Sequence, residues 1–160
     1  MKLGLLWVGK TRDRNISSAI QGYLKRVARY VAVDITEIKE APASDEHSEK
    51  EALQKEGRRI REKVPRGHQV VVMDPRGEEM SSEEFGRFLE RKINSSSSSL
   101  KGLTFVIGGH LGLDEEAKAM ANHTISMSRM TLTHEMARLL LVEQIYRGLS
   151  MARGGQYHRR

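Results

Sequence analysis

A glycine-rich segment that joins apolar residues to a run of carboxylates is the first place where this chain can hold a ligand. In FVIGGHLGLDEEAK, residues 105–118, apolar residues suited to a buried strand run into Gly108, Gly109 and Gly112. Glycine adopts backbone angles closed to other residues, and Asp114 can cap a helix whose first turn is acidic. A strand, a tight turn and a helix start are therefore predicted. Two functions of the glycines remain open: they let the backbone lie against a ligand, or they only let the strand reverse.

The other reactive side chains exclude several familiar chemistries. The sequence has no cysteine, so it holds no disulfide, thiolate metal site or cysteine nucleophile. Its six histidines are dispersed and form no HExxH or other close ligand pair, so we expect no bound metal. The spacing of GGHLG differs from the dinucleotide-binding fingerprint, and neither a phosphate loop nor a nucleophile elbow occurs.

Length and charge are typical of one basic domain. The 160 residues, 38% of them hydrophobic, suffice for a single core, and no internal repeat marks a second domain, so residues 1–160 are expected to form a single domain. A formal charge of +6 favours a polyanionic partner, RNA or DNA rather than a membrane, although such charge also serves solubility. The opening MKLGLLWVGK is apolar for too few residues to be a signal peptide or a membrane span, so a cytoplasmic protein is expected.

The elements that must position the glycine turn follow an α/β pattern. Short β-type runs alternate with longer stretches of helical period, which predicts a sheet layered with helices. The expected strands are residues 2–9, 31–39, 69–74, 103–107 and 124–127. Between them we expect a helix with an apolar stripe from Ile16 to Val27, a more charged helix over residues 44–63, and a helix after Ser81 that ends in a flexible serine-rich connector at residues 94–100.

The segment TLTHEMARLLLVEQIYRGLSM, residues 131–151, predicts a helix that is apolar around most of its circumference. Thr133 is suited to cap it. Such a helix is either central in a large protein or shared with a partner subunit, and this chain is small for the first arrangement. We therefore expect a homodimer. The alternative is that the helix fits between the sheet and another helix of the same chain.

Three separated segments together resemble one known family. IGGHLGLDEEAK, ISMSRMTLTHEMARLLLVEQIYRG and the terminal GGQYHRR are similar to segments of the ribosomal RNA large-subunit methyltransferase H family, within the SPOUT or α/β-knot class. The opening KLGLLWVGK, the VVVMDPRG strand and the overall length agree, so the resemblance covers essentially the whole chain. It implies a single-domain α/β-knot fold, with a mainly parallel sheet flanked by helices and a C-terminal trefoil knot that periodicity alone does not predict.

The resemblance also implies an activity and a site. The activity is S-adenosylmethionine-dependent methylation of N3 of a pseudouridine in large-subunit (23S) rRNA, by a homodimer acting on the assembled ribosome. Arg129 stands in a loop where other members carry small or aliphatic residues, so it is expected either to point outward or to touch the carboxylate of the donor. Carried over residue by residue, the donor pocket corresponds to Met73, Gly108, Met127, Ser128, Arg129, Met130, Thr131 and Leu132.

Methylation of an imide nitrogen requires loss of its proton, so a base or a cationic group that stabilises the resulting anion is expected. The candidates are His158, with Tyr157 and Arg159, because a C-terminal tail can fold over the pocket mouth or reach the partner subunit. A frayed chain end is the alternative. The weaker candidates are His134, Arg138 and Arg147.

Contact with RNA is expected to be mostly electrostatic. Lys10, Arg12 and Arg14 follow the first strand on the side of the sheet where the pocket is expected, and can meet phosphates; an ordinary solvated loop is the alternative. Two other classes of function stay open. A non-catalytic ribosome-binding or RNA-binding α/β module would not bind S-adenosylmethionine, and a flavodoxin-like small-molecule enzyme would not respond to ribosomes.

Overall fold

Five strands of the described residues, 1–94 and 100–154, form one parallel sheet in the computed structural model. They are β1 (Lys2–Val8), β2 (Ala32–Ile38), β3 (His68–Glu79), β4 (Gly102–Ile107) and β5 (His123–Ser126), in the spatial order β2-β1-β4-β3-β5. All five predicted strands are thus present, with the end of one of them corrected below, and the predicted fold class of a parallel sheet flanked by helices is confirmed.

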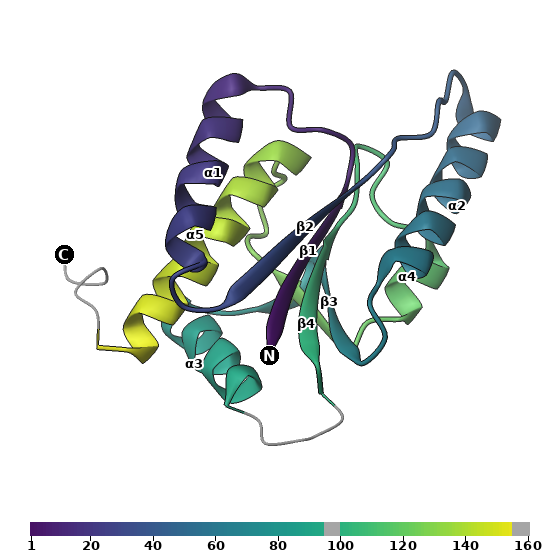
Figure 1. Ribbon diagram of the computed structural model, residues 1–160. Helices are drawn as coiled ribbons and strands as arrows, with labels where there is room; N and C mark the ends of the chain where they lie inside the picture. The colour runs from purple at the N-terminus through teal and green to yellow at the C-terminus, as the bar shows by residue number, and fades with distance from the viewer. Residues whose placement is uncertain (95–99, 155–160) are drawn as a thin grey trace.

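Helices cover both faces of the sheet (Figure 1). Helices α1 (Arg14–Val27), α3 (Ser82–Ile93) and α5 (His134–Ala152) lie on one face, and α2 (Glu46–Lys63) and α4 (Glu115–Ala119) lie on the other. Successive residues of a strand pack against opposite helix layers. In β1, Leu5 belongs to the core beneath α1, α3 and α5, while Leu6 belongs to the core that includes Ile60 of α2. Strands buried on both faces have this near-continuous apolar sequence because successive side chains point to opposite faces.

The helices begin where short polar side chains cap them. The carboxylate of Asp114 accepts from the backbone N–H of Ala117, and the hydroxyl of Thr133 accepts from the N–H of Met136. Both caps were predicted, and both are confirmed. Ser81 caps α3 and forms a reciprocal capping box with Glu84.

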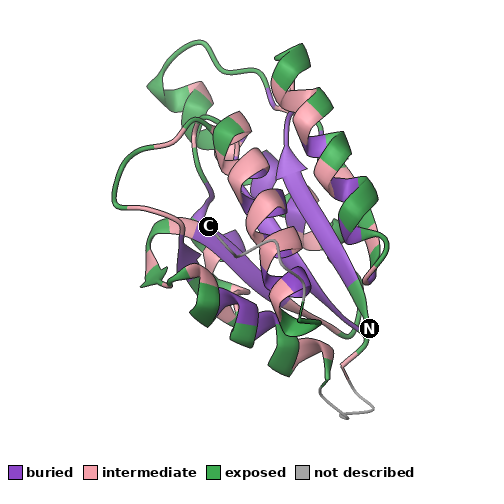
Figure 2. Ribbon diagram, turned by 90° about the vertical axis from the view of Figure 1, so that its left-hand side faces the viewer, coloured by how far each residue is buried: buried purple, intermediate pink, exposed green. Residues whose placement is uncertain are grey.

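Helix α5 lies between α1 and α3, above the sheet (Figure 2). Its close fit against α3 needs glycine on both sides, because a Cβ at Gly148 would lie 2.9 Å from the Cα of Gly86. Helices α1 and α3 therefore cover much of the broad apolar surface of α5. This packing agrees with the stated alternative to a homodimer, in which the helix fits between elements of the same chain. Met136, Leu139 and Leu140 nevertheless stay exposed or only half-buried on its outer side.

Strand β3 continues beyond its predicted end. It runs to Glu79 rather than to residue 74, with a register irregularity in which Met73 and Glu78 both pair with Ile125 of β5. The predicted end is wrong because Pro75 and Gly77, which normally mark turns, here lie within a bulge. Gly77 is pressed against β5, since a Cβ there would lie 2.7 Å from the main chain of Ile125.

Two predicted features fall partly or wholly beyond the described residues. The serine-rich connector coincides with residues 95–99, and the catalytic tail with residues 155–160, neither of which the structure describes. Within residues 1–94 and 100–154, no helix combines the length and apolar character needed to span a bilayer.

Candidate functional site

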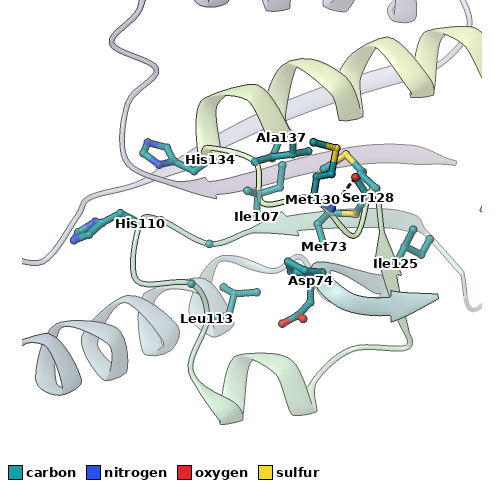
Figure 3. A pocket seen from close by; sticks show the side chains of 16 residues that line it. Met73, Asp74, Ile107, His110, Leu113, Ile125, Ser128, Met130, His134 and Ala137 are labelled. Carbon is teal, nitrogen blue, oxygen red and sulfur yellow. Dashed lines mark hydrogen bonds between the residues drawn. The ribbon is translucent and has the colours of Figure 1, made fainter. Parts of the chain in front are cut away.

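A cavity of about 260 Å³ lies at the carboxyl ends of β3, β4 and β5 (Figure 3). Its walls come from the bulge of β3, the glycine turn after β4, the loop after β5 and the first turn of α5. Parallel sheets bind ligands at this edge because the loops that leave the strands converge there. Small-molecule sites typically enclose about 300–1,000 Å³, so the cavity, at about 260 Å³, lies just below that range.

The structure brings most of the predicted pocket residues together. Six of the eight line the cavity: Met73, Gly108, Met127, Ser128, Met130 and Leu132. The other two, Arg129 and Thr131, do not. Arg129 takes the outward orientation, because its Nε lies 3.3 Å from Oε1 of Glu79 and 88% of its side chain is exposed.

The glycine turn is shaped by contacts within itself. A Cβ at Gly108 would lie 2.3 Å from the carbonyl oxygen of Gly112. The backbone N–H of Gly112 in turn donates to the carbonyl oxygen of Gly109 at 3.1 Å. Gly112 has a φ of +82°, a value that favours glycine. Reversal of the chain therefore explains the glycines at positions 108 and 112, although the turn also forms one wall of the cavity.

The loop after β5 is folded by serine hydrogen bonds. The hydroxyl of Ser126 donates to the carbonyl of Ser128 at 3.1 Å, and the hydroxyl of Ser128 accepts from the N–H of Met130 at 2.9 Å. These bonds hold Met130 at the rim of the cavity with 76% of the residue exposed. An unbranched, polarizable side chain in this place can fold over a ligand.

Several lining residues were not predicted. Asp74 and Pro75 come from the bulge, and the DP pair directly after an apolar strand is the signal that marks them. Leu113 and Ile125 carry no such signal, because in the sequence they are indistinguishable from ordinary core residues. Beyond the six predicted pocket residues, the cavity is lined by Asp74, Pro75, Ile107, Gly109, His110, Gly112, Leu113, Ile125, His134 and Ala137. Of these, Gly109 and Gly112 belong to the predicted glycine turn, and His134 was a weaker candidate at the acceptor.

Among the described residues, the ionisable side chains that line the cavity are Asp74, His110 and His134. Burial works to raise the pKa of Asp74. Arg76 works to lower that pKa and outweighs burial, because its charge lies close by and it donates two hydrogen bonds to Oδ1 of Asp74, from its backbone N–H at 2.9 Å and from its Nε at 3.3 Å. The net pKa of Asp74 is therefore below its usual value. Burial lowers the pKa of His134, so its imidazole is neutral at pH 7 and can accept a proton.

The remaining candidates have different surroundings. Arg138 is fully buried, and Arg147 pairs with Glu143 on α5 at 2.7 Å. Arg12 is exposed, and its Nη2 lies 3.1 Å from Oε2 of Glu40. The structure does not describe the tail that carries the predicted catalytic residues Tyr157, His158 and Arg159. In the part of the chain that it does describe, no group of three or more histidine, aspartate or glutamate side chains is placed to hold a metal ion.

The parallel sheet and the loop-lined cavity at its carboxyl edge agree with a match to a family model. The model described as "Predicted SPOUT methyltransferase" matches residues 1–158, and the chain therefore belongs to the SPOUT methyltransferase family. Within that class, proteins named Ribosomal RNA large subunit methyltransferase H are similar to it along its whole length. The relative from Geotalea daltonii is 39% identical over 158 residues, which cover 99% of each chain. The relative from Syntrophotalea carbinolica is 42% identical over 160 residues and 100% of each chain, and these matches confirm the predicted resemblance.

Solved structures support the fold. A probable methylase family protein from Haemophilus influenzae Rd KW20 superimposes with a TM-score of 0.55 over 99% of this chain and 70% of that one, at 12% identity. TrmJ from Z. mobilis ZM4 gives a TM-score of 0.55 over 91% of this chain and 69% of that one, at 16% identity. At such low identities the likeness is evidence for the fold alone.

Proposed function

We propose that this chain is the S-adenosylmethionine-dependent enzyme that methylates N3 of a pseudouridine in large-subunit (23S) rRNA, on the assembled ribosome in the cytoplasm. The family and the names of its full-length relatives support an rRNA methyltransferase. The observation that carries the proposal is the convergence of Met73, Gly108 and Met130 from three different loops on one cavity.

The chemistry of the cavity wall suits a sulfonium donor. Most of the side chains that line it are aliphatic or thioether groups, among them Ile107, Leu113 and Leu132. A sulfonium loses its positive charge as its methyl group leaves, so an apolar, poorly hydrated site does not oppose transfer. Walls fixed by strand ends also hold donor and acceptor in line, which is a large part of the acceleration of such reactions. Asp74, ionised at neutral pH, is the residue we expect to attract the ammonium group of the donor.

Residues beyond the cavity complete the proposed enzyme. Contact of His158, Tyr157 and Arg159 with the acceptor is retained as part of the proposal, as is the trefoil knot implied by the family. We further propose that the functional unit is a homodimer, in which a second copy covers the outer side of α5. This arrangement gives a partner to Leu140, which is half-buried, and to Met136, which is exposed.

Transfer of a tritiated methyl group from S-adenosylmethionine to ribosomes and to naked rRNA tests the proposal. We expect label in one pseudouridine of the large subunit, with ribosomes as the better substrate, and nucleoside mapping identifies the position. Ala137→Arg places a long cation in the cavity and should abolish both transfer and donor binding measured by calorimetry. Gly22→Ala, on α1 with open space around it, should leave both intact.

The same measurements separate the alternatives. A wild-type protein that binds ribosomes but shows no saturable binding of S-adenosylmethionine would be a non-catalytic ribosome-binding module. A protein that binds the donor but transfers no label to any rRNA would contradict the substrate assignment alone.

A further inference from the structure

His134 is an ionisable side chain of the cavity that the described fold does not use in a hydrogen bond. His134 is the first residue of α5, it is half-buried, and it lines the cavity at the end where His110 also lies (Figure 3). Within residues 1–94 and 100–154 its ring takes part in no hydrogen bond. The helix cap is supplied by Thr133, and the adjacent loop is held by the carboxylate of Glu135. The imidazole is therefore available to a ligand.

The surroundings of His134 favour the neutral imidazole. Burial is the main cause of its lowered pKa, and the cation of Arg138, one helical turn along α5, acts in the same direction. His110 from the glycine turn also lowers the pKa, while Glu135 on α5 and Glu40 beyond β2 work to raise it. The positive end of the α5 dipole further disfavours a second proton on the ring. An imidazole of this kind holds an open acceptor site near neutral pH.

The proposed reaction requires one proton acceptor. Transfer breaks the methyl–sulfur bond, with its electron pair remaining on sulfur, and forms a bond between the methyl carbon and N3 of the acceptor base. The N3 proton must leave to a base. Asp74 is a weak candidate, because its lowered pKa and its two hydrogen bonds from Arg76 reduce its basicity.

We propose that His134 is a catalytic residue that takes the N3 proton of the acceptor base as the methyl group is transferred. This inference rests on the proposed function and assigns a proton acceptor within it. The proton moves to the free ring nitrogen, and the imidazolium formed takes over the positive charge that sulfur loses. The carboxylates of Glu135 and Glu40 then stabilise that imidazolium, because both favour the protonated ring.

Single-turnover methyl transfer to ribosomes, at saturating S-adenosylmethionine and from about pH 5 to about pH 9, tests the assignment. The wild-type rate should fall on the acid side as one group becomes protonated. His134→Ala should lower the rate at neutral pH by about 10²–10⁴-fold and should remove that acid limb. His134→Ala should also retain donor affinity to within about twofold, and added imidazole should restore part of its rate.

Two further variants keep the result specific. His47→Ala, on the exposed face of α2 where 88% of the side chain is accessible, should behave as wild type. His158→Ala tests the other predicted base, and it should keep the acid limb even if its rate is reduced. His134→Gln preserves the size of the side chain, and it replaces the alanine variant if thermal unfolding shows that the latter does not fold.

The outcomes are distinct. A His134 variant that keeps the wild-type rate and acid limb would overturn the assignment, as would loss of the limb in His158→Ala alone. A donor affinity weakened by more than about tenfold in His134→Gln would identify a donor contact rather than a base. If wild-type protein binds the donor but labels no ribosome, the proposed function fails first, and the assignment falls with it.

Discussion

The guanidinium of Arg138 donates a hydrogen bond to the main-chain carbonyl of Val8, and this bond joins α5 to the carboxyl end of β1. The same group donates to Oγ1 of Thr11 at 3.0 Å and lies over the ring of Trp7, 5.3 Å from its centroid. The side chain is fully buried, and burial lowers its pKa. A buried cation thus holds the loop that follows β1 beside the helix start that lines the cavity.

Removing this contact should cost much of the stability of the fold. Arg138→Met loses both hydrogen bonds and leaves the carbonyl of Val8 without this donor, so the free energy of unfolding should fall by about 3 kcal/mol. Arg138→Lys keeps the charge, but its single ammonium nitrogen lacks the planar fork with which Nη1 and Nη2 reach Thr11 and Val8 separately, so a loss of about 1–2 kcal/mol is expected. Urea denaturation measures both. Arg129→Ala, at an exposed surface pair, should change stability by less than about 0.5 kcal/mol, and a similar small effect at Arg138 would contradict the argument.

The burial of Arg138 was not predicted, although the helical spacing of its neighbours indicates it. Arg138 was predicted only as a weaker candidate at the acceptor, with the satisfaction of neighbouring carbonyls as the alternative, and its bond to the carbonyl of Val8 agrees with that alternative. Its complete burial was not predicted, because arginine is rarely buried. Its position relative to Leu141, Val142 and Ile145 nevertheless puts it on the buried stripe of α5, since residues three, four and seven apart share a helix face. Periodicity therefore indicated the direction of the Arg138 side chain, whereas its acceptors come from the end of β1 and the loop after it, 130 and 127 residues earlier.

The location of the pocket was predicted from the sequence, whereas the bulge of β3 and the orientation of Arg129 were not. Loops at the carboxyl ends of parallel strands must converge, and Met73 and Gly108 do line one cavity. The bulge that adds Asp74 was missed, because proline and glycine normally end a strand rather than bend it. The outward turn of Arg129 depends on Glu79, which lies on the unpredicted extension of β3. These features arise from tertiary pairing that no local pattern encodes.

The glycine turn should tolerate no side chain at position 108. A Cβ there meets the carbonyl of Gly112, which is backbone and cannot rotate away, so Gly108→Ala should distort the turn. We expect a loss of about 1–3 kcal/mol in stability and a marked weakening of S-adenosylmethionine binding. Gly22→Ala lies in open space on α1 and should stabilise by about 0.5–1 kcal/mol. Wild-type donor binding in a Gly108→Val protein would show that the turn does not bound the donor site.

Glu56 predicts a pH dependence with a definite sign. Its buried carboxylate accepts from the N–H of Ala41 at 2.8 Å, yet burial raises its pKa above the ordinary value. A raised carboxyl pKa means that the folded state holds its proton more tightly, so the charged form destabilises the protein at neutral and higher pH. Glu56→Gln should therefore raise the melting temperature by about 2–4 °C at about pH 8, and the gain should shrink as the pH falls toward about 4.3.

A matched variant on the same helix controls the Glu56 measurement. Glu62 is exposed on α2, so Glu62→Gln should change the melting temperature by no more than about 1 °C at any pH in this range. A Glu56→Gln gain that is the same at about pH 5 and about pH 8 would point to packing rather than to the buried charge.

The outer side of α5 should decide the assembly state. Leu140 is half-buried and lies with Met80 and Gln144 along a hollow between α3 and α5, in a position where a second copy would remove apolar surface from water. Leu140→Arg places a charge there, so light scattering should show a shift from dimer to monomer while the circular dichroism spectrum is retained. Gln21→Arg, on the exposed face of α1, should leave the mass unchanged. Helix α5 also carries His134 and Ala137 into the cavity. Monomeric Leu140→Arg should therefore transfer methyl groups more slowly than wild type. A wild-type protein that is monomeric and fully active would contradict a shared site.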